Sequence, residues 1–156
     1  MIECQNHNSC INEAISRADL ICSKNSISFT DLRKKIFKII LQNHQPVKAY
    51  DILGTLQKED ASAKPTTVYR TLDFLLEHGL VHKLHSINSY TLCTHPLEHN
   101  KCYFMICDTC HEVKECCDVL LTQSVSDVLS KNNFKANKVT IEISGECEKC
   151  SSNLLI

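Results

Sequence analysis

The sequence predicts an α+β fold, with an N-terminal winged helix-turn-helix followed by a small α/β domain that carries a four-cysteine metal site. Four helical segments precede a short pair of strands, which is the element order of a winged helix. Two Cys-x-x-Cys pairs follow in the last third of the chain, and two such pairs complete a tetrahedral zinc site. Only three Gly and three Pro occur in 156 residues, which argues against a Gly/Pro-rich β-sandwich or barrel.

Apolar residues at helical spacing predict four helices in the first half of the chain. The first three cover 11–23, 31–43 and 48–58, and the fourth starts at Lys64-Pro65 and runs up to Gly79. Thr30 is the expected N-cap of the second helix, because a Thr hydroxyl can accept a hydrogen bond from an unpaired amide of the first turn. Pro65 suits the first turn of the fourth helix, and Gly79 suits the position just after its end.

Two short β-rich segments follow the fourth helix and predict the wing. They cover 80–85 and 90–93, around a turn at 86–89 in which no Asn-Gly occurs. A polar connector at 94–101 comes next. Beyond it we expect strands at 102–106 and 112–116, an amphipathic helix at 119–131 and a half-buried strand that includes Val139, Ile141 and Ile143. The predicted organisation is therefore a winged-helix domain at 1–93, a hinge at 94–101 and a second domain at 102–156.

Composition and charge limit the classes of protein to which this chain can belong. The apolar runs are too short for a membrane span, and the N-terminal residues lack the apolar core of a secretory signal, so we expect a cytoplasmic protein. Eleven cysteines in that compartment indicate thiols and metal ligands rather than a disulfide framework. The net charge is −1, but residues 1–93 carry 11 Lys and Arg against 9 Asp and Glu, whereas residues 94–156 carry 6 against 9. The first half can therefore present a local basic face.

The four paired cysteines favour structural zinc. Cys107, Cys110, Cys147 and Cys150 would supply four soft thiolates and leave no open coordination position, which suits a closed tetrahedral site. A redox dithiol or a pair of disulfides is the weaker alternative.

Four segments, spread over nearly the whole chain, resemble the ferric uptake regulator family. They are Phe29-Thr30-x-x-Arg33, Lys64-Pro65-Thr66-Thr67-Val68-Tyr69-Arg70-Thr71-Leu72, Cys107-x-x-Cys110 and Ile141-Glu142-x-x-Gly145-x-Cys147-x-x-Cys150. The zinc uptake regulator branch is most similar, through residues 72–83 and 88–93. The resemblance implies a dimeric, metal-dependent transcription factor whose C-terminal domain mediates dimerisation.

The resemblance also implies a second, regulatory metal site. Its ligands fall on His82, Cys93, His99 and Glu115, although His99 is one residue out of register, so His95 or Cys102 remains an alternative connector ligand. One thiolate among nitrogen and oxygen ligands favours zinc over iron, while the Irving–Williams order alone does not exclude copper or nickel. The expected cofactor is therefore two Zn²⁺ per subunit, with the regulatory ion locking the dimer in a DNA-binding geometry.

The fourth helix and its neighbours should contact operator DNA. The expected DNA-binding residues are Arg33, Lys64, Thr66, Thr67, Tyr69 and Arg70, and the resemblance also implies Tyr50 on the third helix. Arg70 can bind guanine through two hydrogen bonds, whereas Lys64 and Arg33 would contact phosphate. The plainer readings are a core aromatic for Tyr69 and a surface ion pair for Arg70.

The function that the sequence predicts is a zinc-responsive repressor of zinc-uptake genes, acting as a homodimer on double-stranded DNA. An iron- or peroxide-sensing regulator of the same family is the alternative. A thiol oxidoreductase would need a thioredoxin-like βαβ unit around Cys107, and a zinc hydrolase would need an open metal position beside a general base. Neither pattern is present, so we expect no enzyme activity, no small organic substrate and no membrane partner.

Overall fold

The structure is a computed structural model that describes residues 7–42, 45–95 and 102–151. The chain divides into two compact units, with the division between Cys93 and Thr94. No helix among the described residues is long and apolar enough to span a membrane.

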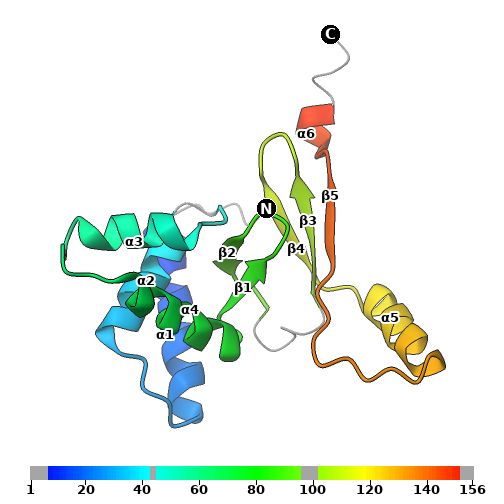
Figure 1. Cartoon of the computed structure of the whole chain (residues 1–156), viewed down its shortest axis with the longest axis horizontal. Coiled ribbons are helices and arrows are strands. Elements are labelled where there is room, and N and C mark those ends of the chain that lie inside the picture. The colour runs from blue at the N-terminus through cyan, green and yellow to red at the C-terminus, as the bar shows by residue number, and fades with distance from the viewer. Residues whose placement is uncertain (1–6, 43–44, 96–101, 152–156) are drawn as a thin grey trace. The chain divides into compact units, whose positions relative to one another are not determined.

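Unit 1 contains the four predicted helices (Figure 1). They are α1 (His7–Lys24), α2 (Asp31–Leu41), α3 (Ala49–Gln57) and α4 (Pro65–Glu77). The predicted helix at 11–23 was too short at its N-terminal end, because the polar residues before Ile11 contain no helix breaker and extend the same helix. Thr30 caps α2 as predicted, with its hydroxyl accepting from the Arg33 amide at 3.5 Å.

The end of α4 leads directly into the wing. Gly79 takes a left-handed conformation (φ 65°), and the Leu80 amide reaches back to the Leu75 carbonyl at 2.9 Å. This is the helix end that Gly79 predicted. The wing then pairs β1 (Val81–Leu84) with β2 (Ser89–Leu92) in antiparallel register. Asn88, with φ 47°, supplies the left-handed turn residue in place of an Asn-Gly pair.

The core of unit 1 lies between its helices and the wing. Side chains from α2, α3, α4 and the wing are almost fully buried in it, among them Ile36, Phe37, Ile52, Leu72, Leu75 and Val81. The buried positions of α4 fall on one face, so the opposite face of that helix remains exposed.

Unit 2 is built on a three-stranded sheet in the order β4-β3-β5. The strand β3 (Tyr103–Cys107) runs antiparallel to β4 (Val113–Cys116) and parallel to β5 (Glu142–Gly145). Two helices complete the unit: α5 (Val119–Lys131) has the predicted bounds, and the single turn α6 (Glu148–Ser151) was not predicted (Figure 1). The last strand begins later than the alternation indicated, although the Ile141 carbonyl still accepts from the Phe104 amide.

Unit 2 buries few side chains. Among the described residues, only Phe104, Ile106 and Cys107 are buried apolar side chains of this unit, and α5 buries none. Its large exposed apolar side chains are Met105, Val119, Leu120, Val128, Phe134, Val139 and Ile143. The predicted amphipathic helix is present, but the described residues cover its apolar face only in part, because Leu121, Val125 and Leu129 are half-buried and Val128 is exposed.

Candidate functional site

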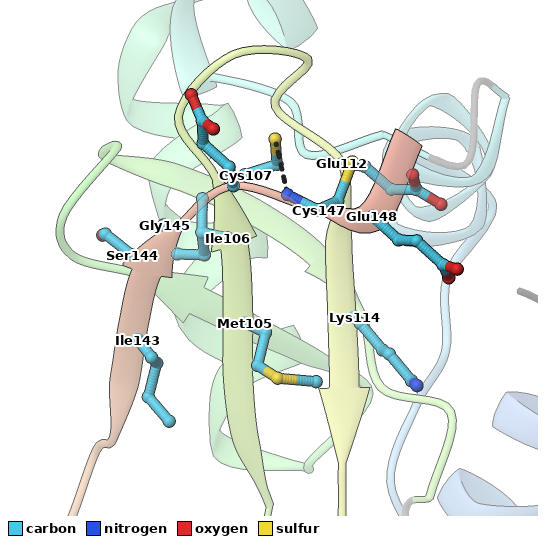
Figure 2. Close-up of a pocket in the computed structure, with 11 residues that line it drawn as sticks. Met105, Ile106, Cys107, Glu112, Lys114, Ile143, Ser144, Gly145, Cys147 and Glu148 are labelled. Atoms are coloured by element: carbon cyan, nitrogen blue, oxygen red, sulfur yellow. Dashed lines mark hydrogen bonds between the residues drawn. The ribbon is translucent and has the colours of Figure 1, made fainter. Parts of the chain in front are cut away.

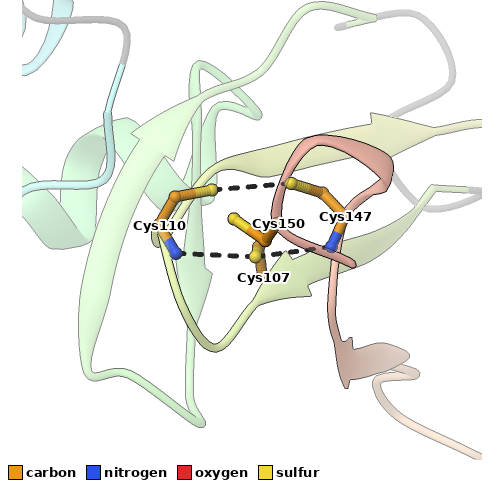
Figure 3. Close-up of side chains that lie close together, drawn as sticks. All are labelled: Cys107, Cys110, Cys147 and Cys150. Atoms are coloured by element: carbon orange, nitrogen blue, oxygen red, sulfur yellow. Dashed lines mark hydrogen bonds between the residues drawn. The ribbon is translucent and has the colours of Figure 1, made fainter. Parts of the chain in front are cut away.

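The two Cys-x-x-Cys pairs meet at one end of the unit 2 sheet (Figure 3). Cys107 ends β3 and lies opposite Gly145 of β5, Cys147 directly precedes α6, and Cys150 lies within α6. The four Sγ atoms lie within 4.8 Å of one another. This arrangement is the one that a tetrahedral zinc ion requires, because four thiolates of one unit can reach a common centre.

Backbone amides polarise this cluster. The amides of Cys110 and Cys147 point at Cys107 Sγ from 3.5 and 3.4 Å, and these hydrogen bonds lower the pKa of the Cys107 thiol to about 6. A hydrogen bond with the Cys147 side chain, together with burial, raises the pKa of Cys150 to about 12. One sulfur is therefore already a thiolate at neutral pH, whereas a metal ion must displace the proton from Cys150.

A shallow pocket adjoins the cluster on one face of the sheet (Figure 2). Met105, Lys114 and Ile143 lie side by side on neighbouring strands and form its floor. Met105 and Ile143 are 37% and 47% exposed, so the described residues leave this apolar face beside the cysteine cluster open.

A second pair of metal-binding side chains lies in the wing of unit 1. His82 is on β1, and Cys93 follows β2, where its amide donates to the Leu80 carbonyl at 3.0 Å. Because Cys93 is opposite Leu80, His82 and Cys93 are diagonal neighbours on the same face of the hairpin. A ring nitrogen of His82 and the Cys93 sulfur lie within 4.8 Å, and the two residues are only 8% and 2% exposed.

Glu115 belongs to unit 2 and has a defined setting there. Its Oε2 accepts hydrogen bonds from the Thr94 amide at 2.8 Å and from the Thr94 hydroxyl at 2.6 Å. The same hydroxyl lies 2.9 Å from His95 Nδ1, and the Glu115 side chain is 6% exposed. His99, the expected connector ligand, lies outside the described residues.

Unit 2 holds a cysteine pair that corrects one sequence expectation. Cys102 and Cys117 form a disulfide, although the cysteine usage indicated thiols and metal ligands only. Their sulfurs also belong to a group with His95 and Glu115 whose ligand atoms lie within 4.8 Å of one another. The pairing register of the structure explains the contact: with Tyr103 opposite Cys116, the next residues outward are Cys102 and Cys117.

The expected DNA-binding residues occupy the exposed side of unit 1. Tyr50 on α3 and Tyr69 on α4 are 81% and 52% exposed, so Tyr69 is not the core aromatic of the plainer reading. Lys64, Thr66 and Arg70 are also exposed, and Thr67 is half-buried. Their position follows from the burial of Val68 and Leu72 on the opposite face of α4.

Arg33 has packing partners of its own. Its guanidinium carbon lies 3.6 Å from the centroid of the Phe74 ring, and its Nη1 donates to the Ser28 carbonyl. This contact ties the start of α2 to α4. The phosphate contact of Arg33 stays a prediction. The same side chain also has this packing role.

The sequence of this chain is similar to those of known proteins. Residues 24–144 match the Ferric uptake regulator family. The zinc uptake regulation protein of Escherichia coli (strain K12) is 37% identical over 141 residues, which cover 88% of this chain and 81% of that protein. The relative of the same name from Mycobacterium tuberculosis (strain H37Rv) is 30% identical over 104 residues, covering 67% of this chain and 79% of that protein.

The fold of this chain is also similar to those of solved structures. A zinc uptake regulator complexed with zinc and DNA superposes with a TM-score of 0.88 at 33% identity, covering 94% of this chain and 98% of that chain. Holo XcZur superposes with a TM-score of 0.83 at 32% identity, covering 90% and 99%. The family match spans most of the sequence and includes the wing, β3 and β4. The chain therefore belongs to the ferric uptake regulator family.

Proposed function

We propose that this chain is a zinc-responsive, DNA-binding transcriptional repressor that acts as a homodimer in the cytosol. The observation that carries the proposal is the similarity over 94% of the chain to a zinc uptake regulator complexed with zinc and DNA. The expected targets are zinc-uptake genes. Its action is binding rather than turnover, and no catalytic step is proposed.

The structural zinc site of the proposal is the cluster of Cys107, Cys110, Cys147 and Cys150. Four sulfurs within 4.8 Å match the ligand number and type of a closed zinc site. The ligands join the β3–β4 turn to α6, 40 residues apart in sequence between Cys107 and Cys147. Because these segments bury little apolar surface, the metal–ligand bonds would supply much of the folding free energy of unit 2.

The regulatory site of the proposal begins with His82 and Cys93. A buried imidazole and a buried thiol within 4.8 Å are a partial zinc site that requires further ligands. Glu115 is the third proposed ligand, and its hydrogen bonds to Thr94 hold it to the residue that directly follows Cys93 in the chain. The fourth ligand comes from the connector and is assigned to His99, with His95 and Cys102 as alternatives.

These ligands explain how zinc would control DNA binding. Two of them belong to the wing of unit 1, and the others belong to the connector and to unit 2. Side chains that share one ion restrict the motion of one unit against the other. An ordered pair of winged helices loses less freedom on binding two half-sites, which corresponds to a coupling of about 1–3 kcal/mol, or a 5–150-fold gain in affinity.

DNA contacts are assigned to the exposed side of α4 and to Tyr50. Thr66, Tyr69 and Arg70 lie in the first turns of α4, the part of a recognition helix that meets base edges. Arg70 would read guanine, and Lys64, at the N-cap of α4, would contact phosphate.

Dimerisation is assigned to unit 2. Its exposed apolar side chains on α5 and on the sheet, such as Leu120, Val128 and Ile143, are 78%, 58% and 47% exposed. A second copy that packs on these side chains would bury apolar surface that the single chain leaves in contact with water.

The proposal is tested by zinc-buffered titration of the reduced protein against a labelled DNA duplex from upstream of neighbouring zinc-transport genes. We expect fluorescence anisotropy to rise steeply over a narrow range of free zinc, with no rise on a scrambled duplex. Equal affinity for both duplexes at every zinc concentration would contradict the proposal. Iron-stimulated binding without a zinc response would favour the iron-sensing alternative.

A further inference from the structure

The pair Cys102 and Cys117 flanks the paired ends of β3 and β4. Tyr103 and Cys116 are partners in the β3–β4 ladder, so Cys102 and Cys117 face each other one step beyond it. Their Cα atoms are 4.2 Å apart, which is the short spacing of directly opposed antiparallel residues. Both side chains are half-buried, so soluble reagents can reach them.

Two further ligands surround this pair. Ligand atoms of His95 and Glu115 lie within 4.8 Å of both sulfurs. All four residues belong to unit 2. With the thiols reduced, the group offers two sulfurs, one imidazole nitrogen and one carboxylate oxygen, a donor set that suits a tetrahedral thiophilic divalent ion.

We propose that Cys102 and Cys117 form a redox-gated metal site with His95 and Glu115. In the reduced state the four side chains bind a zinc-like divalent ion, and in the oxidised state the disulfide removes both sulfur ligands. The site differs from the regulatory site as assigned above to His82, Cys93, Glu115 and His99, with which it shares Glu115 but neither thiol. The inference therefore adds an oxidant response to a protein whose proposed signal is zinc.

The oxidation balances with a hydroperoxide as the oxidant. One cysteine thiolate attacks the peroxide oxygen, which breaks the O–O bond and gives a sulfenic acid; with hydrogen peroxide, the leaving hydroxide takes up the thiol proton and becomes water. The second thiol attacks the sulfenic sulfur, the S–S bond forms, and a second water leaves. A dithiol reductant reverses the reaction by exchange and becomes a disulfide itself.

The compartment supports a switch rather than a permanent cross-link. A DNA-binding regulator works where glutathione and thioredoxin keep thiols reduced, and disulfides in that compartment are mostly transient or redox-sensing.

Cys116 provides a matched control for Cys117, because adjacent residues of a strand point to opposite faces of the sheet. It is a free, half-buried thiol next to Cys117, and it belongs to none of the metal-binding groups found among the described residues.

The first experiment tests the disulfide. Reduced full-length protein is treated with hydrogen peroxide, then digested and mapped by mass spectrometry. We expect a linked peptide that joins Cys102 to Cys117, loss of the link after treatment with a dithiol, and the same result in Cys116→Ser protein. Linkage of Cys117 to any other cysteine, or overoxidation of both thiols without a link, would overturn the proposal.

The second experiment tests metal binding by alkylation of reduced protein with and without Zn²⁺. We expect zinc to slow the alkylation of Cys102 and Cys117 but not of Cys116. In Cys102→Ser protein, protection of Cys117 should be lost while protection of Cys93 remains. Loss of protection at Cys93 as well would overturn the separate site, because Cys102 would then be the connector ligand of the regulatory site. These readouts do not depend on DNA binding, so the proposed function can fail without affecting them.

Discussion

The two units of this chain are stabilised in different ways. Unit 1 packs the side chains of its helices and wing into one apolar core, in which Ile36, Ile52 and Leu72 are fully buried. Unit 2 buries only three apolar side chains among its described residues, and α5 contributes none of them. Its hydrogen-bonded strands bring sulfur atoms together instead, in the four-cysteine cluster and in the Cys102–Cys117 disulfide.

This difference assigns separate roles to the two units. A domain with its own apolar core keeps its shape without a partner, which suits an element that presents a fixed surface to DNA. A domain with a small core depends on metal ligands and on association for its stability. We therefore expect metal removal to affect unit 2 first and unit 1 last.

The largest expected effect comes from Cys147→Ser. The substitution removes one proposed zinc ligand and also places a different side chain at the residue whose amide donates to Cys107. Structural zinc contributes on the order of 10–16 kcal/mol in small domains, which exceeds the stability of most domains. We expect loss of zinc from this site and loss of the stable dimer, measured by metal analysis and light scattering.

Cys116→Ser is the matched control, because it removes a thiol of the same unit that lies outside the cluster. Hydrogen exchange of Cys147→Ser protein should still show protected amides in α2 and α4. A Cys147→Ser protein that keeps its full zinc content would remove Cys147 from the zinc site. One that loses this zinc but stays dimeric would contradict the comparison, since unit 2 would then be stable without its metal.

A core truncation in unit 1 should have a smaller effect on stability, and this effect should fall on unit 1 rather than on unit 2. Leu72 is fully buried in α4, and Leu72→Ala should lower the free energy of unfolding of unit 1 by about 2–5 kcal/mol. Thermal unfolding followed by circular dichroism would measure this loss. Zinc content and dimerisation should persist at temperatures where unit 1 remains folded, and a loss of structural zinc there would show that the units are not independently stabilised.

The pair of His82 and Cys93 in the wing predicts an effect on regulation rather than on folding. Cys93→Ala removes the proposed thiolate ligand, so we expect a folded dimer whose DNA affinity no longer rises 5–150-fold with zinc. Cys22→Ala is the matched control, because Cys22 is also a buried cysteine of unit 1, with 1% exposure, and belongs to none of the metal-binding groups found among the described residues. Zinc-stimulated binding that survives in Cys93→Ala protein would remove Cys93 from the sensor.

The sequence predicted most of unit 1 because its signals are local. Helical spacing of apolar residues, the Thr30 cap and the Gly79 helix end each act within a few residues, and all three are confirmed. The Cys-x-x-Cys pairs were equally readable, since their spacing predicts two sulfurs that can face one ion, and the cluster in the structure contains all four.

Unit 2 was less predictable because its contacts are made between distant segments. The β5 strand begins at Glu142, after part of the apolar alternation, since only residues that pair with β3 become strand. The Cys102–Cys117 pair depends on a register that the two predicted strands did not specify. The roles of His82, Cys93 and Glu115 came from family resemblance, because composition and spacing do not distinguish a buried ligand from a buried core residue.

The smallest expected effect compares helix caps in the two units. Thr30 caps α2 through a long hydrogen bond of 3.5 Å, whereas the Asp118 carboxylate caps α5 through a bond of 2.7 Å to the Leu120 amide. Loss of a cap costs about 0.5–2 kcal/mol, and a carboxylate also interacts favourably with the positive end of the helix dipole. We therefore expect Asp118→Ala to cost close to 2 kcal/mol and Thr30→Ala to cost about 0.5 kcal/mol.

Amide exchange in the first turns of α2 and α5 measures each cost locally. Asp118→Asn should restore most of the protection, because the amide oxygen still accepts the bond and only the charge is lost. The packing of α2 against the unit 1 core also limits fraying after Thr30→Ala, whereas α5 has no buried side chain to hold its first turn. A larger loss of protection in α2 than in α5 would mean that α5 is held by contacts beyond its own unit, as packing against a second copy would provide.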